Sequence, residues 1–493
     1  MKAFAMSIDL TLNDLSRLSR VRQVLSENDP NRQFASLDMA EVHIGEDVLP
    51  LLCKVIDRHL GEAGRPTGRD TQVRMIVDPV TILRGETDLK AHVESLLAAR
   101  YAVTRVTMDD GHPVLHADET ILDQASEASV GADVIVSVGG GTITDVAKIA
   151  AERNGAPVHV VIQTAASVDG FTDNFAVVLQ NSVKTTLLSR WPQAVLADTT
   201  VIADAPHYLN ASGFGELLSM YAAPGDWFLA ARMGMDPKYA PVLLEMLDLC
   251  GGGIEDWSGG ISRGEPDACA KLTTALAMRG IVTGVGGTTA SLSGMEHLIS
   301  HMFDMVNGEL HEPTGLHGAQ VGVGSVIRAA AWEVFCERVA EEGLDSATLF
   351  PAIGNYEAEV KAGFAWLDPS GRIGAECWGR YAKKLTAWHK ARDKVVASFA
   401  DWEGLRAEHD RLAFGSHKIA RYLARAGAAM RFGDLDPAPS AGRLHWVVRN
   451  CQFMRERFTV ADLLILAGWW DDPGVTRVLD RVEQACAMAH EAR

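Results

Sequence analysis

Three histidines and a glutamate have the residue types and spacing of a metal site. His297 and His301 are four residues apart in "SGMEHLISHMFDM", so a helix would place both on one face. His317 follows in "GLHGAQVGVGS", and Glu216 in "ASGFGELLSMY" offers a carboxylate. Such a set could hold a divalent cation that activates an alcohol. The two histidines could equally be ordinary helix neighbours, and His311 competes with His317.

A glycine-rich turn is the second candidate site. In "VIVSVGGGTITDVAKIA", a buried strand runs through Gly139, Gly140 and Gly141 directly into a helix. Glycines let backbone amides approach a ligand, and the start of a helix offers free N–H groups to an anion. This combination suits a diphosphate. The alternative interpretation is a tight turn between strand and helix.

The next strand ends in "QTAASVDGFTDN", residues 163–174. Ligands of open parallel sheets bind outside the carboxyl ends of the strands, where this loop and the glycine turn would both lie. Thr164 and Ser167 supply hydroxyls, and Asp169 supplies a carboxylate before the flexible Gly170. Asp169 could also be a turn-forming aspartate before glycine.

The elements that must position these residues alternate along the first part of the chain. Short apolar runs at 73–78, 103–109, 132–138 and 157–164 alternate with helical periods, which is typical of a parallel sheet. "FAVVL" and "AVLADTTVIAD" are predicted to add edge strands. After Pro206 strand signals nearly vanish, and helical periods take over. Ser212 is predicted to cap the helix of Glu216, with Gly213 and Gly215 in its first turn.

We therefore predict an α/β N-terminal nucleotide-binding domain with a parallel sheet, followed by an all-α C-terminal domain. The predicted divisions are an N-terminal extension at 1–37, the α/β domain at 38–205 and the helical metal and substrate domain at 206–493. Of the 493 residues, 22% are charged, which is ordinary for a globular protein.

The overall charge limits the classes of partner. A net charge of −18 argues against a nucleic-acid partner and means that an anionic substrate needs a local positive site. The seven cysteines include no CxxC pair, which favours reduced thiols. No apolar run reaches the length of a membrane span, and the charges in the first 20 residues argue against a signal peptide. We expect a cytoplasmic protein.

The motifs taken in order resemble a known family. They are "VGGGTITDVAK", "TAASVDGFT", "ASGFGELLSMY…DW", "SGMEHLISH", "LHGAQVGVGS" and "RFTVADLLILAG". This order is similar to that of the sn-glycerol-1-phosphate dehydrogenases, whose superfamily includes glycerol dehydrogenase, iron-dependent alcohol dehydrogenases and 3-dehydroquinate synthase. The similarity runs from about residue 40 to about residue 470.

The resemblance implies an enzyme of phospholipid biosynthesis with a dehydroquinate synthase-like fold and a metal in the cleft between its domains. Implied cofactors are NAD or NADP and one divalent metal, which could be zinc, nickel or iron. The implied reaction interconverts glycerol 1-phosphate and dihydroxyacetone phosphate, or a related polyol and ketone, and members are commonly homo-oligomers. The metal would lower the pKa of the substrate hydroxyl, which would lose its proton, and hydride would pass from the carbon that bears this hydroxyl to the nicotinamide. His301 would orient the substrate or relay the proton.

Residue roles follow from the same resemblance. Glu216, His297 and His317 would hold the metal, while Asp169 and His301 would face the substrate. An acid at Asp78 can bond the ribose 2′-hydroxyl and repels a 2′-phosphate, which favours NAD over NADP. The implied cofactor-binding positions are Asp78, Gly139, Gly140, Gly141, Thr142, Ile143, Thr164, Ala165, Ala166, Ser167 and Asp173.

Two positions depart from the family pattern. Glu216 stands where the family usually has aspartate, and its extra methylene shifts the carboxylate. Asp173 stands where the family usually has serine, which adds negative charge near the cofactor and would disfavour a substrate phosphate. Lys184 and Arg190 are the candidate cations for such a phosphate. Three alternatives stay open. The substrate could be a neutral polyol, or the chain could be a non-catalytic nucleotide-binding homologue. It could also be a sugar-phosphate cyclase, a family that usually has glutamate at the position of Glu216.

Overall fold

The computed structural model describes residues 15–16, 18–112, 114–180 and 183–491. The chain forms two compact units. The first contains the described residues up to Gly213 together with Pro241–Gly287, and the second contains Phe214–Ala240 and the described residues from Thr288 onward. The change from one unit to the other falls inside helix α7 (His207–Leu218). The division into domains 1–37, 38–205 and 206–493 stays a prediction.

A parallel sheet organises the first unit, as predicted. Every neighbouring pair of its six strands runs parallel. In spatial order the strands are β1 (Glu41–Gly45), β10 (Ala194–Asp198), β7 (Val158–Gln163), β6 (Val134–Gly139), β2 (Gln72–Val77) and β5 (Ala102–Thr107).

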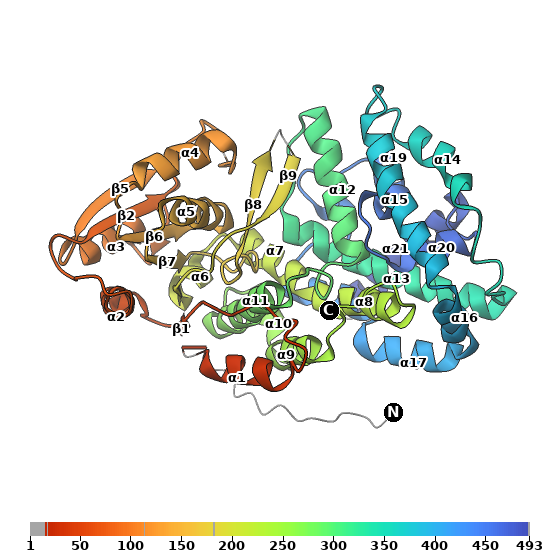
Figure 1. Ribbon diagram of the computed structural model, residues 1–493, viewed down its shortest axis with the longest axis horizontal. Coiled ribbons are helices and arrows are strands. Elements are labelled where there is room, and N and C mark those ends of the chain that lie inside the picture. The colour runs from red at the N-terminus through yellow and green to blue at the C-terminus, as the bar shows by residue number, and fades with distance from the viewer. Residues whose placement is uncertain (1–14, 17, 113, 181–182, 492–493) are drawn as a thin grey trace. The chain divides into compact units, whose positions relative to one another are not determined.

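Helices cover both faces of this sheet (Figure 1). Apolar residues of α2 (Leu52–Glu62) and α3 (Leu89–Ala98) pack in one hydrophobic cluster with the sheet, and those of α4 (Glu119–Ala128) and α5 (Gly141–Asn154) pack in another. Residues of the central strands β6 and β7 are therefore buried on both sides. This is why those strands read as continuous apolar runs rather than alternating ones.

Two strand predictions were wrong in position. β10 lies inside the sheet between β1 and β7, and β1 and β5 form its edges. "FAVVL" belongs to β8 (Phe175–Gln180), which pairs antiparallel with β9 (Val183–Leu188) in a separate hairpin. "TTVIAD" forms the short helix α6 (Thr199–Asp204), because the Asp198 carboxylate accepts the Thr200 N–H and caps it. Apolar runs of this length do not reveal where a strand lies in a sheet.

Further elements complete the first unit. They are α1 (Ser19–Glu27), a small hairpin of β3 (Leu83–Arg84) and β4 (Thr87–Asp88), and the helices α9 (Pro241–Gly251), α10 (Ile254–Ile261) and α11 (Pro266–Gly286). Helix α11 packs closely on the loop that follows β7. A Cβ added at Gly280 would lie 2.5 Å from the Asp169 carbonyl oxygen.

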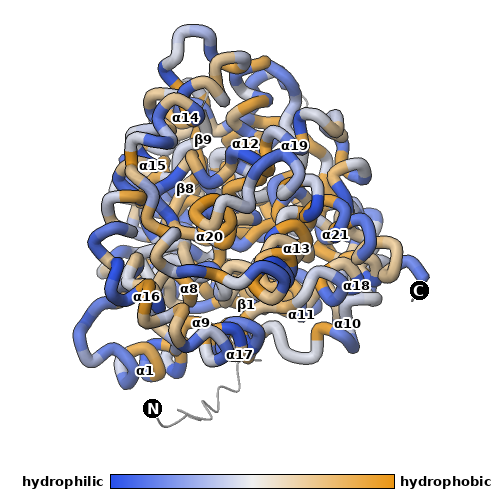
Figure 2. Tube along the Cα trace, turned by 90° about the vertical axis from the view of Figure 1, so that its right-hand side faces the viewer, coloured by the Kyte–Doolittle hydropathy of each residue, from blue (hydrophilic) through white to orange (hydrophobic). Residues whose placement is uncertain are grey.

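The described residues of the second unit form helices and connecting loops without strands, as predicted. Helix α20 is mostly hydrophobic and buried, whereas α17 is largely hydrophilic (Figure 2). The α-helices of the unit beyond α7 are α8 (Ala223–Arg232), α12 (Met295–Leu310), α13 (His317–Glu342), α14 (Glu357–Gly363), α15 (Arg372–Lys390), α16 (Arg392–Ala400), α17 (Trp402–Leu412), α18 (Ser416–Ala426), α19 (Ala441–Asn450), α20 (Val460–Leu466) and α21 (Asp472–Glu491). None of the described helices has the length and apolar character needed to cross a membrane.

Candidate metal centre and nucleotide-binding edge

Three of the predicted metal ligands come together in the second unit. Glu216 comes from α7, His297 from the first turn of α12, and His317 is the first residue of α13. The Nε2 atoms of His297 and His317 lie 3.3 and 3.7 Å from the two carboxylate oxygens of Glu216. One ligand atom from each residue lies within 4.8 Å of the others. This is the donor set expected for a zinc-like ion with an open position.

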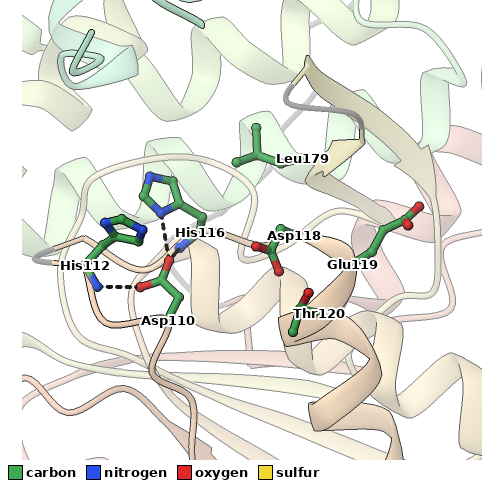
Figure 3. A pocket seen from close by; sticks show the side chains of 7 residues that line it. All are labelled: Asp110, His112, His116, Asp118, Glu119, Thr120 and Leu179. Carbon is green, nitrogen blue, oxygen red and sulfur yellow. Dashed lines mark hydrogen bonds and ion pairs between the residues drawn. The ribbon is translucent and has the colours of Figure 1, made fainter. Parts of the chain in front are cut away.

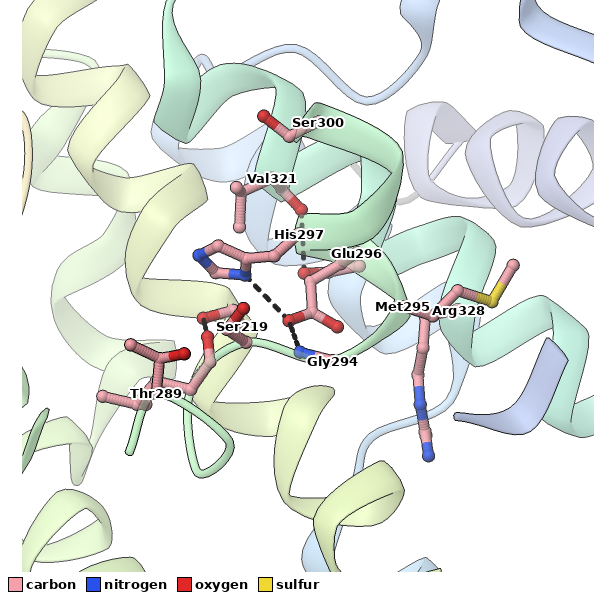
Figure 4. Close-up of polar contacts among 12 residues, drawn as sticks. Ser219, Thr289, Gly294, Met295, Glu296, His297, Ser300, Val321 and Arg328 are labelled. Atoms are coloured by element: carbon pink, nitrogen blue, oxygen red, sulfur yellow. Dashed lines mark hydrogen bonds and ion pairs between the residues drawn. The ribbon is translucent and has the colours of Figure 1, made fainter. Parts of the chain in front are cut away.

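Each histidine is oriented through its other ring nitrogen. The Glu296 Oε1 atom accepts the Gly294 N–H at 2.6 Å and lies 2.9 Å from His297 Nδ1 (Figure 4). The Ser300 hydroxyl donates to Gln320 at 2.7 Å and lies 3.0 Å from His317 Nδ1. Both imidazoles therefore present Nε2 to Glu216, and such outer partners fix the tautomer of a metal ligand.

The electrostatics of this group favour positive charge. Burial lowers the pKa of His297, but the carboxylates of Glu216 and Glu296 outweigh burial and raise it to about 9. The same carboxylates would stabilise a dication between the Nε2 atoms. The residues present therefore fit a divalent metal, which Glu216, His297 and His317 could hold.

Glycines in α7 allow this approach, though not as the sequence predicted. Ser212 lies inside α7 rather than at its start, because the helix begins five residues earlier at His207. Gly213 and Gly215 are thus interior positions. A Cβ added at Gly215 would lie 2.3 Å from the Gly318 carbonyl oxygen, so glycine is needed for the close contact with the start of α13, next to His317.

His301 lies beside the metal group rather than within it. Its ring centroid is 5.5 Å from that of His317 and 6.1 Å from that of His297. A second grouping of His301, Asp304 and His317 also has ligand atoms within 4.8 Å of one another. It shares His317 with the first group. The assignment of His301 to the substrate stays a prediction.

The glycine turn has the predicted geometry in the first unit. β6 ends at Gly139, Gly140 is the N-cap in an extended conformation, and α5 begins at Gly141. A Cβ at Gly139 would lie 2.9 Å from the Ile143 Cβ, whereas nothing lies within 4 Å of one at Gly140. The backbone amides of Gly141, Thr142 and Ile143 form the first turn of a 14-residue helix. Such amides suit a diphosphate.

The loop after β7 is held by side-chain bonds to its backbone. The Ala166 N–H donates to the Asn210 side chain at 3.0 Å, and the Gln163 amide donates to the Ala165 carbonyl at 3.0 Å. Thr164, Ala165 and Ala166 are buried, while Ser167 is partly exposed. The strand β7 pairs with β6, so this loop and the glycine turn follow neighbouring strands at the same edge of the sheet.

Acidic side chains at this edge are paired with buried cations that the sequence did not reveal. Arg279 of α11, which is 1% exposed, lies 3.2 Å from the Asp169 carboxylate. Lys148 of α5 is fully buried and donates to Asp173 at 2.5 Å, and also to the carbonyls of Gly170 and Phe175. The negative charge that Asp173 was expected to add near the cofactor thus has a buried cation beside it, and its effect on a substrate phosphate stays a prediction.

Asp78 has a similar partner. It follows β2, and the buried Lys90 of α3 lies 2.5 Å from its Oδ1 atom. Lys90 is 12 residues from Asp78, and Lys148 is 25 residues from Asp173. Neither spacing corresponds to a local pattern of a helix or strand, so the sequence does not predict these pairs. Pairs at such distances depend on tertiary packing.

Of the two candidate phosphate cations, only Arg190 has a described side chain, and the role of Lys184 stays a prediction. The side chain of Lys184 lies outside the described residues. Arg190 donates to the carbonyls of Ala151 and Ala156 at the C-terminal end of α5. The glycine turn is at the opposite end of that helix, about 20 Å away at 1.5 Å per residue.

A pocket of about 340 Å³ lies beside the segment that follows β5 (Figure 3). It is lined by Asp110, His112, His116, Asp118, Glu119, Thr120 and Leu179. Its carboxylates already serve local structure: Asp110 lies 2.7 Å from His116 Nδ1 and accepts the His112 N–H, and Asp118 caps α4. We assign no ligand to it.

Comparison with known proteins identifies the family. Residues 69–206 match the iron-containing alcohol dehydrogenases. A glycerol-1-phosphate dehydrogenase (NAD(P)+) from Methanoculleus marisnigri is 36% identical over 238 residues, which are 48% of this chain and 62% of that protein. The corresponding protein from Thermococcus kodakarensis is 32% identical over 250 residues, which are 50% of this chain and 68% of that protein. The chain belongs to the glycerol-1-phosphate dehydrogenase family.

The extent of these matches varies within the family. This chain spans 56% of the protein from Geobacillus thermodenitrificans and 63% of that from Geobacillus stearothermophilus, each 32% identical. Among solved structures, glycerol dehydrogenase from Schizosaccharomyces pombe aligns over 94% of this chain and 92% of its own, with a TM-score of 0.49 and 14% identity. That likeness is too distant to carry a functional conclusion.

Proposed function

We propose that this chain is a metal-dependent, NAD(P)-linked dehydrogenase that interconverts glycerol 1-phosphate and dihydroxyacetone phosphate. The observation that carries the proposal is the convergence of Glu216, His297 and His317, with both Nε2 atoms turned to one carboxylate. Glutamate in place of aspartate still reaches the two imidazoles.

The residues of the second unit would hold the metal and position the substrate. Glu216 would offset the charge of the ion, and Glu296 and Ser300 would keep the two imidazoles in register. His301 lies close enough to the same group to donate a hydrogen bond to a substrate oxygen or to relay its proton. When bound, the metal would polarise that oxygen, and the nicotinamide would carry the hydride.

The first unit would bind the nucleotide. Its glycine turn offers the first-turn amides of α5 to the diphosphate, and Asp78 follows the neighbouring strand β2. The pairing of Asp173 with Lys148 removes the reason to disfavour phosphate at this edge, because the two charges cancel. A phosphorylated substrate is thus compatible with the serine-to-aspartate departure.

The test is oxidation of NADH and NADPH by the purified chain, with zinc or nickel, against dihydroxyacetone phosphate and dihydroxyacetone. We expect turnover with the phosphate, loss of turnover after chelation, and recovery on adding metal. Turnover with dihydroxyacetone but not with its phosphate would contradict the proposed substrate and indicate a neutral polyol instead.

Binding without turnover would contradict the dehydrogenase. If the chain binds both metal and NAD but oxidises neither cofactor with either ketone, a cyclase or a non-catalytic homologue takes its place. Incubation with a sugar phosphate and NAD, followed by phosphate release, would separate these two, since only the cyclase would release phosphate.

Assembly and location extend the proposal. Val177 and Leu188 on the β8–β9 hairpin are 45% and 69% exposed, which supplies apolar surface for a homo-oligomer; light scattering tests this.

All seven cysteines are free, which supports a reducing compartment such as the cytoplasm. Fractionation of cells would test the location.

A further inference from the structure

Asp78 and the glycine turn occupy neighbouring positions at one edge of the sheet. β2 and β6 are adjacent and parallel, and Val77 pairs with Val138. Asp78 and Gly139 therefore follow at the same level, one strand apart. A dinucleotide held by the glycine turn would bring its adenosine ribose within reach of whatever group stands at Asp78.

The buried Lys90 holds the Asp78 carboxylate in place through one of its two oxygens. It is 1% exposed, and its ammonium donates to Asp78 Oδ1 at 2.5 Å, to the Asp78 carbonyl at 2.7 Å and to the Val80 carbonyl at 2.5 Å. The Val80 N–H also donates to Oδ1, at 3.0 Å. All of these side-chain bonds use Oδ1, and the Asp78 side chain is 18% exposed. The carboxylate thus has a buried, neutralised side and a partly exposed side.

We infer that Lys90 sets the choice between NAD and NADP by cancelling the charge of Asp78 while leaving its carboxylate able to accept a hydrogen bond. This inference rests on the proposed function, because it concerns the same nucleotide site. A lone carboxylate would accept the 2′-hydroxyl of NAD and repel the 2′-phosphate of NADP. The ion pair keeps the first interaction and weakens the second. The wild-type chain therefore binds both nucleotides, with a modest preference for NAD.

The test is the ratio of the dissociation constants of NADP⁺ and NAD⁺, measured by calorimetry on the full-length chain. Lys90→Met leaves Asp78 uncompensated, so the ratio should rise roughly tenfold. Asp78→Asn leaves Lys90 uncompensated, so the ratio should fall roughly tenfold. The double variant is neutral at both positions and should return near the wild-type ratio.

The ratio of dissociation constants separates an effect of charge from a structural defect, since a purely structural defect weakens the binding of both nucleotides equally. Lys90→Arg keeps the charge and should keep the ratio. Asp78→Asn preserves volume, so it tests the inference even where Lys90→Met does not fold. A ratio that both single variants leave unchanged, or move in one direction, overturns the inference. A wild-type chain that binds neither nucleotide overturns the proposed function itself.

Discussion

Carboxylates are treated differently in the two units. At the strand edge of the first unit, Asp169 and Asp173 are matched with the buried cations Arg279 and Lys148. In the candidate metal centre of the second unit, Glu216 and Glu296 lie against imidazoles instead. The first arrangement sets a buried cation beside each of these carboxylates, and Lys148 also donates to two backbone carbonyls. The second places two carboxylates against imidazoles, which can lose a proton when a cation takes its place.

This difference matches what each region is proposed to bind. A dinucleotide and a phosphorylated substrate are anions, and an edge of unpaired aspartates would repel them. A divalent metal needs anionic or neutral donors. A lysine or arginine beside these donors would repel the metal ion. The net charge of −18 is therefore a poor guide to either site, because pairing decides the local charge.

Removing a metal ligand should have the largest effect. His317→Ala leaves Glu216 and His297 as a two-residue set, and a loss of several kcal/mol of stabilisation corresponds to a fall in turnover of at least about a thousandfold. Metal content and initial rate, measured on the same preparation, check this. His311→Asn is the matched control: it removes an imidazole that lies a few residues before His317 in the sequence, at a left-handed position that asparagine tolerates. Full metal content in His317→Ala would contradict the ligand assignment.

Breaking a strand-edge pair should cost stability. Asp173→Ser restores the residue usual in the family but strands the ammonium of Lys148 in the core, at a cost of about 3 to 5 kcal/mol in the free energy of unfolding. Chemical denaturation, followed by probes in the first unit, measures this cost.

Asp145→Asn provides the control for that pair. Burial raises the pKa of Asp145 to about 7, its carboxylate lies 3.8 Å from Lys148, and Asp173 remains as the closer partner. We expect a loss below about 1 kcal/mol. An Asp173→Ser variant as stable as the wild type would show that the pair contributes little.

A buried histidine in the second unit, His409, should make the free energy of unfolding depend on pH. Unlike the imidazoles of the candidate metal centre, it lies beside an arginine. Burial, together with the adjacent Arg328, lowers the pKa of His409 to about 4 from 6.5. The unfolded chain therefore binds a proton that the folded chain refuses, so stability is complete above pH 6.5 and falls as the pH drops toward 4. The loss should reach about 2 kcal/mol at pH 5.

Burial and Arg328 lower the pKa of His409 against the opposite effect of two nearby carboxylates. Arg328 donates to its Nε2 atom at 2.8 Å, Asp410 lies 3.1 Å from Nδ1, and Arg328 is paired with the buried Asp226. Denaturation at pH 7 and pH 5 should show a smaller difference in His409→Gln than in the wild type. Equal differences in both proteins would place the acid sensitivity elsewhere.

The sequence predicted the parts of the fold that depend on local patterns. The apolar runs of β2, β6 and β7, the glycine turn and the i, i+4 histidines of α12 were all readable, because periodicity and backbone chemistry are local. The position of β10 within the sheet and the start of α7 were not, since neighbours far along the chain decide them. Sequence analysis also missed Lys90, Lys148 and Arg279 for that reason.

Glu296 is the residue whose absence from the sequence prediction teaches most about the metal centre. It precedes His297, and adjacent helix residues do not share a face, so spacing gave no signal. Its contact with Nδ1 depends on the turn at Gly294, whose N–H it also accepts at the N-terminus of α12. The residue that orients the metal ligand is thus fixed by how the helix begins.

Glu296→Gln should have a smaller effect than the ligand, ion-pair and histidine changes above. The amide oxygen can still accept from Gly294 and His297, so the ring keeps its place, but the negative charge behind it is gone. Affinity for Zn²⁺ should fall about tenfold, at the lower end of the range for outer partners of metal ligands. Competition against a chromophoric chelator measures it. Ser300→Ala, which acts on His317 through a neutral hydroxyl, gives the comparison: if it weakens the metal as much as Glu296→Gln does, then orientation and not charge is what Glu296 supplies.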